Sequence, residues 1–242
     1  MATFVIVHGA FGGGWEWTPV AQALRQSGHE VYTPTLSGMG ERSHLGPGVG
    51  LATHVEDIVA VLEFEDLRNV VLCGASYGGM AVSAAAGQVP ERISLVVYID
   101  ALIPRDGESG LDLLPPGFGE TVRADPDGDG WVRVPPAILP PEGLIPEEER
   151  AHYVARLRPQ PIATFTEPLR LNGALDRLPR AFIRCTGGQL DVGGDPIAPM
   201  AARARSEGWL YRELRLPHDP HLFDPVGTAA VLAELAAVVS KP

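Results

Sequence analysis

The chain is poor in cysteine and has no long apolar run. Cys73 and Cys185 are the only cysteines among 242 residues, and they do not form a CxxC pair. Both follow apolar runs, so we expect buried thiols at strand ends, without a disulfide framework or a metal site. No segment approaches the roughly 18 consecutive apolar residues of a membrane-spanning helix. The N-terminal apolar run, residues 4–7, is too short for a signal-peptide core and no basic region precedes it, so we expect a cytoplasmic protein.

Basic residues are also scarce. Lys and Arg number 19 against 30 Asp and Glu, which gives a formal net charge of −11. Nucleic-acid phosphates and anionic membrane surfaces attract Lys and Arg, so we expect no nucleic acid and no membrane as a partner. The excess of acidic residues also favours solubility.

Strands and helices alternate at both ends of the chain. Apolar, β-branched runs indicate strands buried on both faces. Thr53 with Glu56 three residues later is typical of a capping box at the start of a helix. The alternation predicts an α/β fold, a mostly parallel sheet with helices on both faces. The expected strands are 4–7, 29–33, 69–73, 93–99, 181–185 and 210–216, and the expected helices are 19–26, 53–64, 79–88, 199–207 and 226–239.

The middle of the chain has a different character. Residues 104–179 are rich in proline and contain one clear helical stretch, about residues 146–158. A segment of this length between two strands is too long for a plain loop. We expect it to form a cap over the carboxyl ends of the strands, inserted into a core made of residues 1–103 and 180–242.

The strongest motif is Gly74-Ala75-Ser76-Tyr77-Gly78. A GxSxG pattern is a weak signal alone, but here a strand precedes it and a small-residue helix follows it, as in a nucleophile elbow. The turn is so tight that the residues two before and two after the nucleophile must be small. Ser76 is then held in a strained conformation with its hydroxyl exposed. The pattern predicts that Ser76 is a nucleophile.

A serine nucleophile needs a base, and two histidines lie between the last strand and the last helix. They are His218 and His221. A metal clip made by this HxxH pair is disfavoured because Pro220 prevents a helix there. We favour His218 as the base because the loop begins at Pro217, and we expect His221 to be a packing neighbour. His221, Phe118 and Trp131 are candidates for the lining of the substrate pocket.

The glycine-rich segment after the first strand is a candidate oxyanion hole. A tetrahedral intermediate needs two N–H donors. We expect one from Tyr77, directly after the nucleophile, and the other from Ala10 or Phe11. A phosphate-binding loop is disfavoured, since no acid follows on a second strand and no Lys-Ser/Thr pair is present. No cofactor is therefore expected.

These motifs resemble the α/β-hydrolase superfamily, and within it the family of plant methyl-ester esterases of the salicylate-binding type, hydroxynitrile lyases and related bacterial esterases. The resemblance covers nearly the whole chain. It rests on His8-Gly9-Ala10, on residues 74–80, and on His218 with Pro225 seven residues later. The lyase members are similar to one another in a Thr after the first-loop His and a Lys after the catalytic His. Gly9 and Asp219 stand at these positions, which favours ester hydrolysis over cyanohydrin cleavage.

The acid of the expected triad has two candidates. The family resemblance implies an acid about three residues after Cys185, where Gly187-Gly188 stands. A second solution in this fold places the acid at the end of the strand after the nucleophile helix. Asp100 fits that position and is favoured, and Asp191 is the alternative. Either carboxylate would hold the imidazole tautomer and stabilise the imidazolium.

Together these features predict a serine hydrolase that cleaves a small carboxylic ester or lactone through an acyl-enzyme on Ser76. Two alternatives stay open: a lyase- or cyclase-type enzyme of small-molecule metabolism with the same pocket, and a non-catalytic small-molecule binding protein on the same fold. The partner is expected to be the small-molecule substrate, with the homodimer as one alternative for the oligomeric state.

Overall fold

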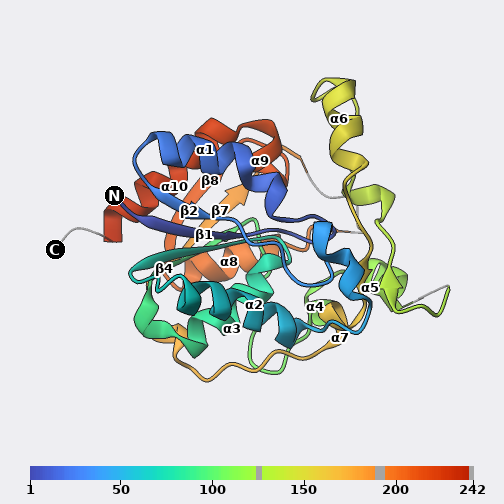
Figure 1. Cartoon of the computed structure of the whole chain (residues 1–242), viewed down its shortest axis with the longest axis horizontal. Coiled ribbons are helices and arrows are strands. Elements are labelled where there is room, and N and C mark those ends of the chain that lie inside the picture. Colours follow the sequence, from blue (N-terminus) through green and yellow to red (C-terminus); the bar gives the residue numbers. More distant parts are fainter. Residues whose placement is uncertain (124–126, 189–193, 240–242) are drawn as a thin grey trace.

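Six strands form a parallel sheet at the centre of the molecule (Figure 1). The computed structural model of the chain describes residues 1–123, 127–188 and 194–239. The strand order is β2-β1-β3-β4-β7-β8, and each neighbouring pair is parallel, as the sequence predicts. The strands are β1 (Thr3–Val7), β2 (Glu30–Tyr32), β3 (Val70–Ala75), β4 (Ile93–Ile99), β7 (Arg180–Cys185) and β8 (Leu210–Leu214).

Helices cover both faces of this sheet (Figure 1). One face packs against α1 and α10, and the other packs against α2, α3 and α8. The helices of the core are α1 (Thr18–Gln26), α2 (Leu51–Phe64), α3 (Gly78–Gln88), α8 (Ala198–Ser206), α9 (Pro220–Phe223) and α10 (Pro225–Val239). Short 3-10 helices are η1 (Gly14–Trp17), η2 (Gly40–Leu45), η3 (Pro90–Arg92), η4 (Pro136–Ile138) and η5 (Leu175–Arg177).

Alternate side chains of each strand supply the two hydrophobic layers. On β1, Phe4 and Ile6 face α1 and α10, whereas Val5 and Val7 belong to the layer with α2 and α3. All four side chains are fully buried. Burial of such a side chain stabilises the fold by about 1.5–3 kcal/mol, so these apolar runs both form the strands and hold the helices against them. Cys73 and Cys185 are buried and unpaired as well.

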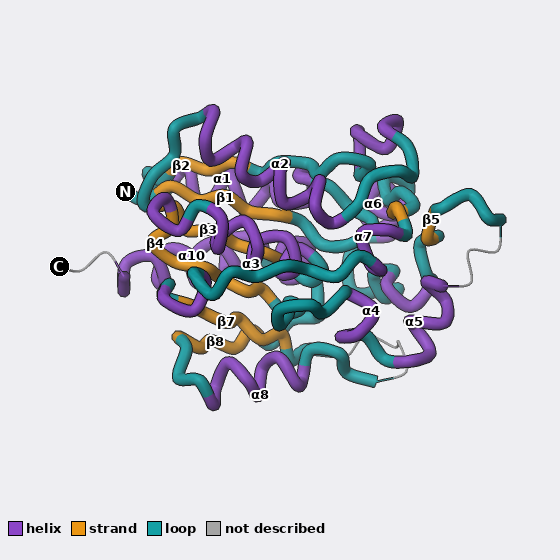
Figure 2. The backbone as a smooth tube through the Cα atoms, turned by 90° about the horizontal axis from the view of Figure 1, so that it is seen from below, coloured by secondary structure: helices purple, strands orange, loops and turns teal. Residues whose placement is uncertain are grey.

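Residues 110–123 and 127–166 lie beyond the carboxyl ends of the strands, whereas residues 170–179 run back along α3 to the start of β7 (Figures 1 and 2). The sequence predicts one helix here, at about 146–158, but the structure has a shorter one and three additional short helices. The many prolines conceal them, because helices of four to eight residues leave too little periodicity to detect. The elements are α4 (Gly110–Leu113), α5 (Pro116–Arg123), β5 (Trp131–Val132), α6 (Glu147–Val154), β6 (Gln160–Pro161) and α7 (Ala163–Thr166), with β5 and β6 antiparallel.

This segment also corrects the predicted start of α2. The capping box of Thr53 and Glu56 is wrong, because α2 begins at Leu51 and its N-cap is Gly50. The N–H of Ala52 donates to a carboxylate oxygen of Glu167 at 2.9 Å. A carboxylate far along the chain therefore satisfies an N-terminal N–H of the helix, which a local sequence pattern does not reveal.

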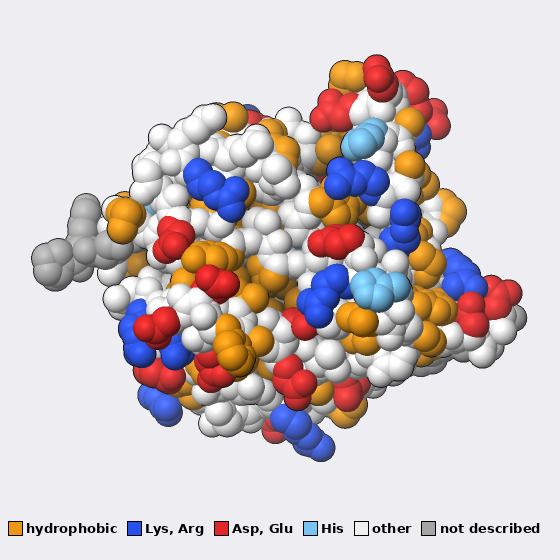
Figure 3. Space-filling view, viewed as in Figure 1, with side chains coloured by type: hydrophobic (Ala, Val, Ile, Leu, Met, Phe, Trp, Pro, Cys, Tyr) orange, Lys and Arg blue, Asp and Glu red, His pale blue; other side chains and the backbone are white. Residues whose placement is uncertain are grey.

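The surface shows charged side chains of both signs among apolar ones (Figure 3). Acidic side chains gather at α6, where Glu147, Glu148 and Glu149 are exposed. Among the described residues, no helix combines the length and the apolar character needed to cross a membrane.

Candidate active site

Ser76 lies in a sharp turn between β3 and α3. The strand ends at Ala75 and the helix begins at Gly78. Ser76 has a φ of 49°, in the left-handed region that a serine rarely adopts and that costs about 1–3 kcal/mol. Three backbone bonds hold it there: the N–H of Ser76 donates to the carbonyl of Ile99, and its carbonyl accepts from the N–H groups of Leu102 and Gly79.

The small residues on either side of Ser76 are required by close backbone approach. A Cβ on Gly78 would lie 2.6 Å from the carbonyl oxygen of His8. A Cβ on Gly74 would lie 2.8 Å from the carbonyl oxygen of Gly78. On the other side, a Cβ on Gly9 would lie 3.2 Å from the Cβ of Ser76. The glycines therefore bring the first-strand loop directly against the serine.

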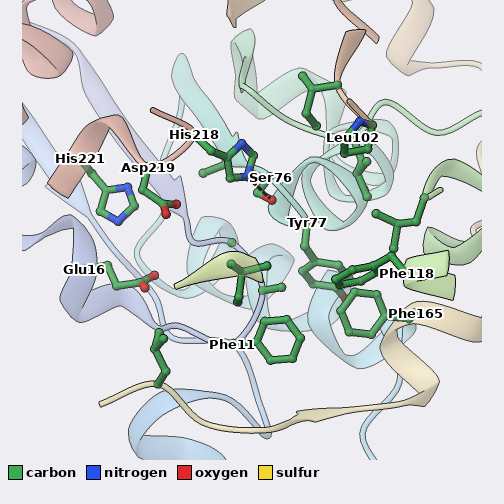
Figure 4. A pocket seen from close by; sticks show the side chains of 18 of the residues that line it. Phe11, Glu16, Ser76, Tyr77, Leu102, Phe118, Phe165, His218, Asp219 and His221 are labelled. Carbon is green, nitrogen blue, oxygen red and sulfur yellow. Dashed lines mark hydrogen bonds between the residues drawn. The ribbon is translucent and has the colours of Figure 1, made fainter. Parts of the chain in front are cut away.

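His218 forms hydrogen bonds with both Ser76 and Asp100. Figure 4 shows His218 beside Ser76. The Nε2 atom of His218 is 2.9 Å from Ser76 Oγ, and its Nδ1 atom is 2.8 Å from Asp100 Oδ2. His218 lies between β8 and α9, and Asp100 directly follows β4. The three groups come from distant parts of the sequence and meet at the carboxyl edge of the sheet.

Asp100 is held from the opposite side by the neighbouring strand. Its Oδ1 atom accepts hydrogen bonds from Arg184 Nη1 at 2.8 Å and from the backbone N–H of Cys185 at 2.9 Å. Arg184 also forms an ion pair with Asp195. Asp100 is buried, so water does not hydrate its carboxylate. These donors stabilise the carboxylate in place of water.

The other acid candidate, Asp191, lies outside the described residues. Gly187 and Gly188 stand where the resemblance implies an acid, and they differ in the space around them: among the described residues, a Cβ on Gly188 would have nothing within 4 Å. A Cβ on Gly187 would lie 2.6 Å from the carbonyl carbon of Leu216, so a side chain there would collide with the chain that leads to His218.

The pKa values of the buried histidines in this region are shifted in different directions. Burial lowers the pKa of His218, but the hydrogen bond and the charge of Asp100 outweigh it, so the pKa lies above the ordinary 6.5. Burial lowers the pKa of His8 to about 4. Because Leu36 N–H donates to His8 Nε2 at 3.1 Å, the His8 proton is on Nδ1, which faces the Gly9 carbonyl at 2.8 Å. His8 is thus a neutral residue that joins two loops.

The predicted oxyanion donors, Ala10, Phe11 and Tyr77, differ in whether their backbone N–H groups already have an acceptor. The N–H of Phe11 donates to Gln160 Oε1 at 3.0 Å, so it is already used. The carbonyl of Phe11 accepts from Arg158 N–H at 2.9 Å. Within the described ranges, the N–H groups of Ala10 and Tyr77 have no acceptor. Of the two predicted donors in the loop after β1, Phe11 therefore has its N–H in use and Ala10 does not.

Tyr77 is anchored by a residue that no sequence motif indicates. Its hydroxyl lies 2.8 Å from His54 Nδ1, and His54 Nε2 lies 2.8 Å from the carbonyl of Ser37. Since a carbonyl only accepts, His54 donates through Nε2 and accepts from the tyrosine hydroxyl. His54 belongs to α2, far from the motif, so only the folded chain brings it to Tyr77.

A cavity opens beside Ser76 and contains about 890 Å³ of space not filled by atoms, part of it continuous with solvent. Phe118 and His221 line it, as expected. Trp131, the third candidate, is not among the lining residues: it is partly exposed and lies in β5, which pairs with β6. The apolar part of the lining includes Leu102, Leu114, Phe118, Ile138, Phe165 and Ile197.

The opposite end of the cavity is polar. Glu16 is buried there, and the hydroxyl of Tyr153 donates to its Oε1 atom at 2.6 Å. Burial, assisted by the charge of Asp219, raises the pKa of Glu16 to about 8. Burial lowers the pKa of His221 to about 4, and the ring packs on Trp17 with 4.6 Å between centroids. A Cβ on Gly12 would lie 2.0 Å from Glu16 Oε2, so the glycine run makes room for this carboxyl.

Sequence reasoning missed Glu16 and Tyr153 at this site. Glu16 lies between two tryptophans in a segment whose glycines attract attention, and Tyr153 comes from α6, 137 positions later. Across residues 1–123, 127–188 and 194–239, no three His, Cys, Asp or Glu side chains are grouped as metal ligands.

A parallel sheet with a serine at a strand-to-helix turn is the arrangement of α/β-hydrolases. The model of the alpha/beta hydrolase family matches residues 4–234 of the chain. The chain belongs to the alpha/beta hydrolase family, which confirms the resemblance drawn from the motifs.

Individual relatives agree with this membership. A carbendazim hydrolyzing esterase of Nocardioides sp. (strain SG-4G) is 39% identical over 184 residues, which cover 72% of this chain and 75% of the relative. Methylesterase 18 of Arabidopsis thaliana is 28% identical over 203 residues, 75% of this chain and 77% of the relative. The solved structure of an extracellular α/β-hydrolase from a Paenibacillus species has a TM-score of 0.87 at 24% identity, covers 97% of this chain and 98% of its own, and shows the shared fold.

We expect Gly78→Ala to lower the free energy of unfolding by about 1–3 kcal/mol, because the new methyl group meets the backbone of the first-strand loop. Urea denaturation measures this change. Gly48→Ala is the matched control, since a Cβ there has nothing within 4 Å. Equal stability of the two variants would contradict the close approach at the turn.

Proposed function

We propose that this carboxylic-ester hydrolase cleaves a small ester or lactone through an acyl-enzyme on Ser76. The observation that carries the proposal is the hydrogen-bond chain from Ser76 through His218 to Asp100 at the wall of the cavity. A nucleophile, a base and a group that orients the base are the parts that acyl transfer requires.

The first half of the reaction forms the acyl-enzyme. His218 Nε2 accepts the Ser76 proton while Oγ attacks the carbonyl carbon of the ester. The N–H groups of Ala10 and Tyr77 donate to the oxyanion of the tetrahedral intermediate. His218 then gives its proton to the leaving alkoxide, and Asp100 stabilises the imidazolium throughout.

The second half releases the acid. A water molecule takes the place of the alcohol, and His218 Nε2 accepts its proton as the oxygen attacks the acyl carbon. The same two N–H groups hold the second oxyanion. Collapse of this intermediate returns the proton from His218 to Ser76 Oγ and frees the carboxylic acid.

The surroundings of Ser76 support a small substrate. Residues 104–179 act as a cap in this proposal, since Leu114, Phe118 and Phe165 of this segment line the cavity. Their apolar side chains favour an aromatic or short aliphatic body. The esterase names of the relatives of known function agree with ester hydrolysis.

A fluorophosphonate probe is expected to add one adduct to the protein, on Ser76. The Ser76→Ala variant should resist labelling and lose roughly 10⁴–10⁶-fold in kcat. Intact-mass and peptide mass spectrometry measure the adduct. An adduct on a different serine would show that the nucleophile is misassigned.

The pH profile tests the base. Neutral His218 is the active form, and its pKa is raised, so kcat/KM is expected to increase with pH along a limb centred above pH 6.5. Asp100→Asn removes the carboxylate charge that raises the pKa of His218, while burial still lowers it, so the limb moves to lower pH. The same variant is expected to lose about 10⁴-fold in kcat. Asp195→Asn is the control, because Asp195 contacts Arg184 but not His218. A limb that stays in place in Asp100→Asn would argue against the assignment.

A substrate panel tests the size limit of the cavity. Methyl benzoate, phenyl acetate and a short lactone are expected to be hydrolysed with a higher kcat/KM than esters of long acyl chains, because the capped cavity accepts only a compact body. Cyanohydrins serve as the lyase control. Release of cyanide without turnover of any short ester, or a preference for long chains, would overturn the proposal.

A further inference from the structure

The polar end of the cavity has hydrogen-bonding capacity that the protein itself does not use. Among the described residues, the buried side-chain nitrogens without a hydrogen-bond partner are Trp17 Nε1, His221 Nδ1 and His221 Nε2. His221 lines the cavity with 5% of its surface exposed. Figure 4 shows its ring directed toward Asp219 and Glu16. Trp17 does not line the cavity, so His221 carries the observation. Unpaired polar atoms are costly when buried, and a neutral imidazole has one N–H donor and one acceptor nitrogen, so His221 points to a polar ligand group at this end of the cavity.

Glu16 is the acceptor best placed to meet such a group. It lines the cavity, and Figure 4 shows it on one side of Ser76, with Phe118 and Phe165 on the other. One of its oxygens accepts the Tyr153 hydroxyl, and the other lies 3.4 Å from the N–H of Gly13. When Glu16 is ionised, both oxygens can accept one more hydrogen bond, and when it is protonated the carbonyl oxygen still can.

The charges around this end select the kind of group. The cavity lining includes Glu16 and Asp219 but no Lys or Arg among the described residues. The nearby Arg156 is stacked over the ring of Trp15 at 4.0 Å. A carboxylate or phosphate on the ligand would find no Lys or Arg to pair with and would lie near Asp219, whereas an N–H donor would meet an acceptor whether Glu16 is neutral or ionised.

We propose that Glu16, positioned by Tyr153, is a specificity-determining residue that accepts a hydrogen bond from an N–H group on the ester substrate. The substrate class is then an ester with an aromatic or other compact apolar body that carries an amine, amide or heteroaromatic N–H. The apolar end of the cavity holds the body, Ser76 attacks the ester carbonyl, and Glu16 binds the N–H. This inference rests on the proposed function.

Matched ester pairs test the inference. Methyl 3-aminobenzoate and methyl 4-aminobenzoate have N–H donors, and their N,N-dimethylamino counterparts lack them. The measured quantity is the kcat/KM of the ester with the N–H donor divided by the kcat/KM of its N,N-dimethylamino counterpart. For at least one pair this ratio is expected to be about tenfold higher in the wild type than in Glu16→Met, since the comparison of ratios removes the effect of the added methyl groups.

Three further variants define the result. Glu16→Gln keeps one acceptor oxygen and is expected to retain part of the preference. Tyr153→Phe is expected to reduce it by releasing the carboxyl. Glu148→Met makes the same chemical change at an exposed position of α6 and is expected to leave the ratio unchanged. Circular dichroism checks folding, and Glu16→Gln and Tyr153→Phe decide the question if Glu16→Met does not fold.

A binding measurement separates this inference from the proposed function. Indole and 1-methylindole differ in one N–H, and calorimetric titration into Ser76→Ala needs no hydrolysis. Indole is expected to bind about tenfold more tightly than 1-methylindole, and Glu16→Met in the same background is expected to abolish the difference.

The outcomes are distinct. Cleavage of methyl benzoate with equal ratios in wild type and Glu16→Met would overturn the inference and leave the proposed function intact. Failure to cleave any ester would overturn the proposed function, and the titration then decides the role of Glu16: an indole preference that depends on Glu16 supports it, and equal or absent binding of the two indoles refutes it.

Discussion

The close approach between the turn at Ser76 and the loop after β1 is the constraint on which the site depends. It is set by backbone atoms: Gly78 faces the carbonyl of His8, and Gly9 faces the Cβ of Ser76. With the two segments in contact, the serine hydroxyl and the N–H groups of Ala10 and Tyr77 lie at one place. The strain at Ser76 persists because β3, α3 and the strand-end bonds from Ile99 and Leu102 fix both sides of the turn.

Asp100, the acid of the proposed triad, depends on the neighbouring strand β7. Asp100 follows β4, while β7, after which the resemblance places the acid, contributes Arg184 instead. The arginine gives the buried carboxylate a partner, and Gly187 keeps the adjacent chain clear for the loop of His218. Asp100, Arg184 and Gly187 thus form one arrangement at the ends of two neighbouring strands, and each depends on the others.

The sequence predicts the features that depend on local pattern. Apolar runs locate the strands, and the glycines around Ser76 predict its turn. What the sequence does not predict comes from contacts between distant segments: the cap of α2 by Glu167, the anchoring of Tyr77 by His54, and the pairing of Glu16 with Tyr153. Phe11 is an instructive case, since its position in the loop qualifies it as an oxyanion donor and only the side chain of Gln160 removes it.

The two bonds of Phe11 have a mechanical consequence. Its N–H and its carbonyl are both held by residues 158–160, through Gln160 and Arg158. Any movement that lifts this stretch breaks both bonds together and frees the residue next to Ala10. The position of residues 158–160 and the alignment of the loop after β1 are therefore coupled through Phe11. In the proposed reaction, a molecule so bulky that residues 158–160 lose both bonds to Phe11 would occupy the cavity without an aligned Ala10 N–H, and would inhibit the enzyme instead of reacting.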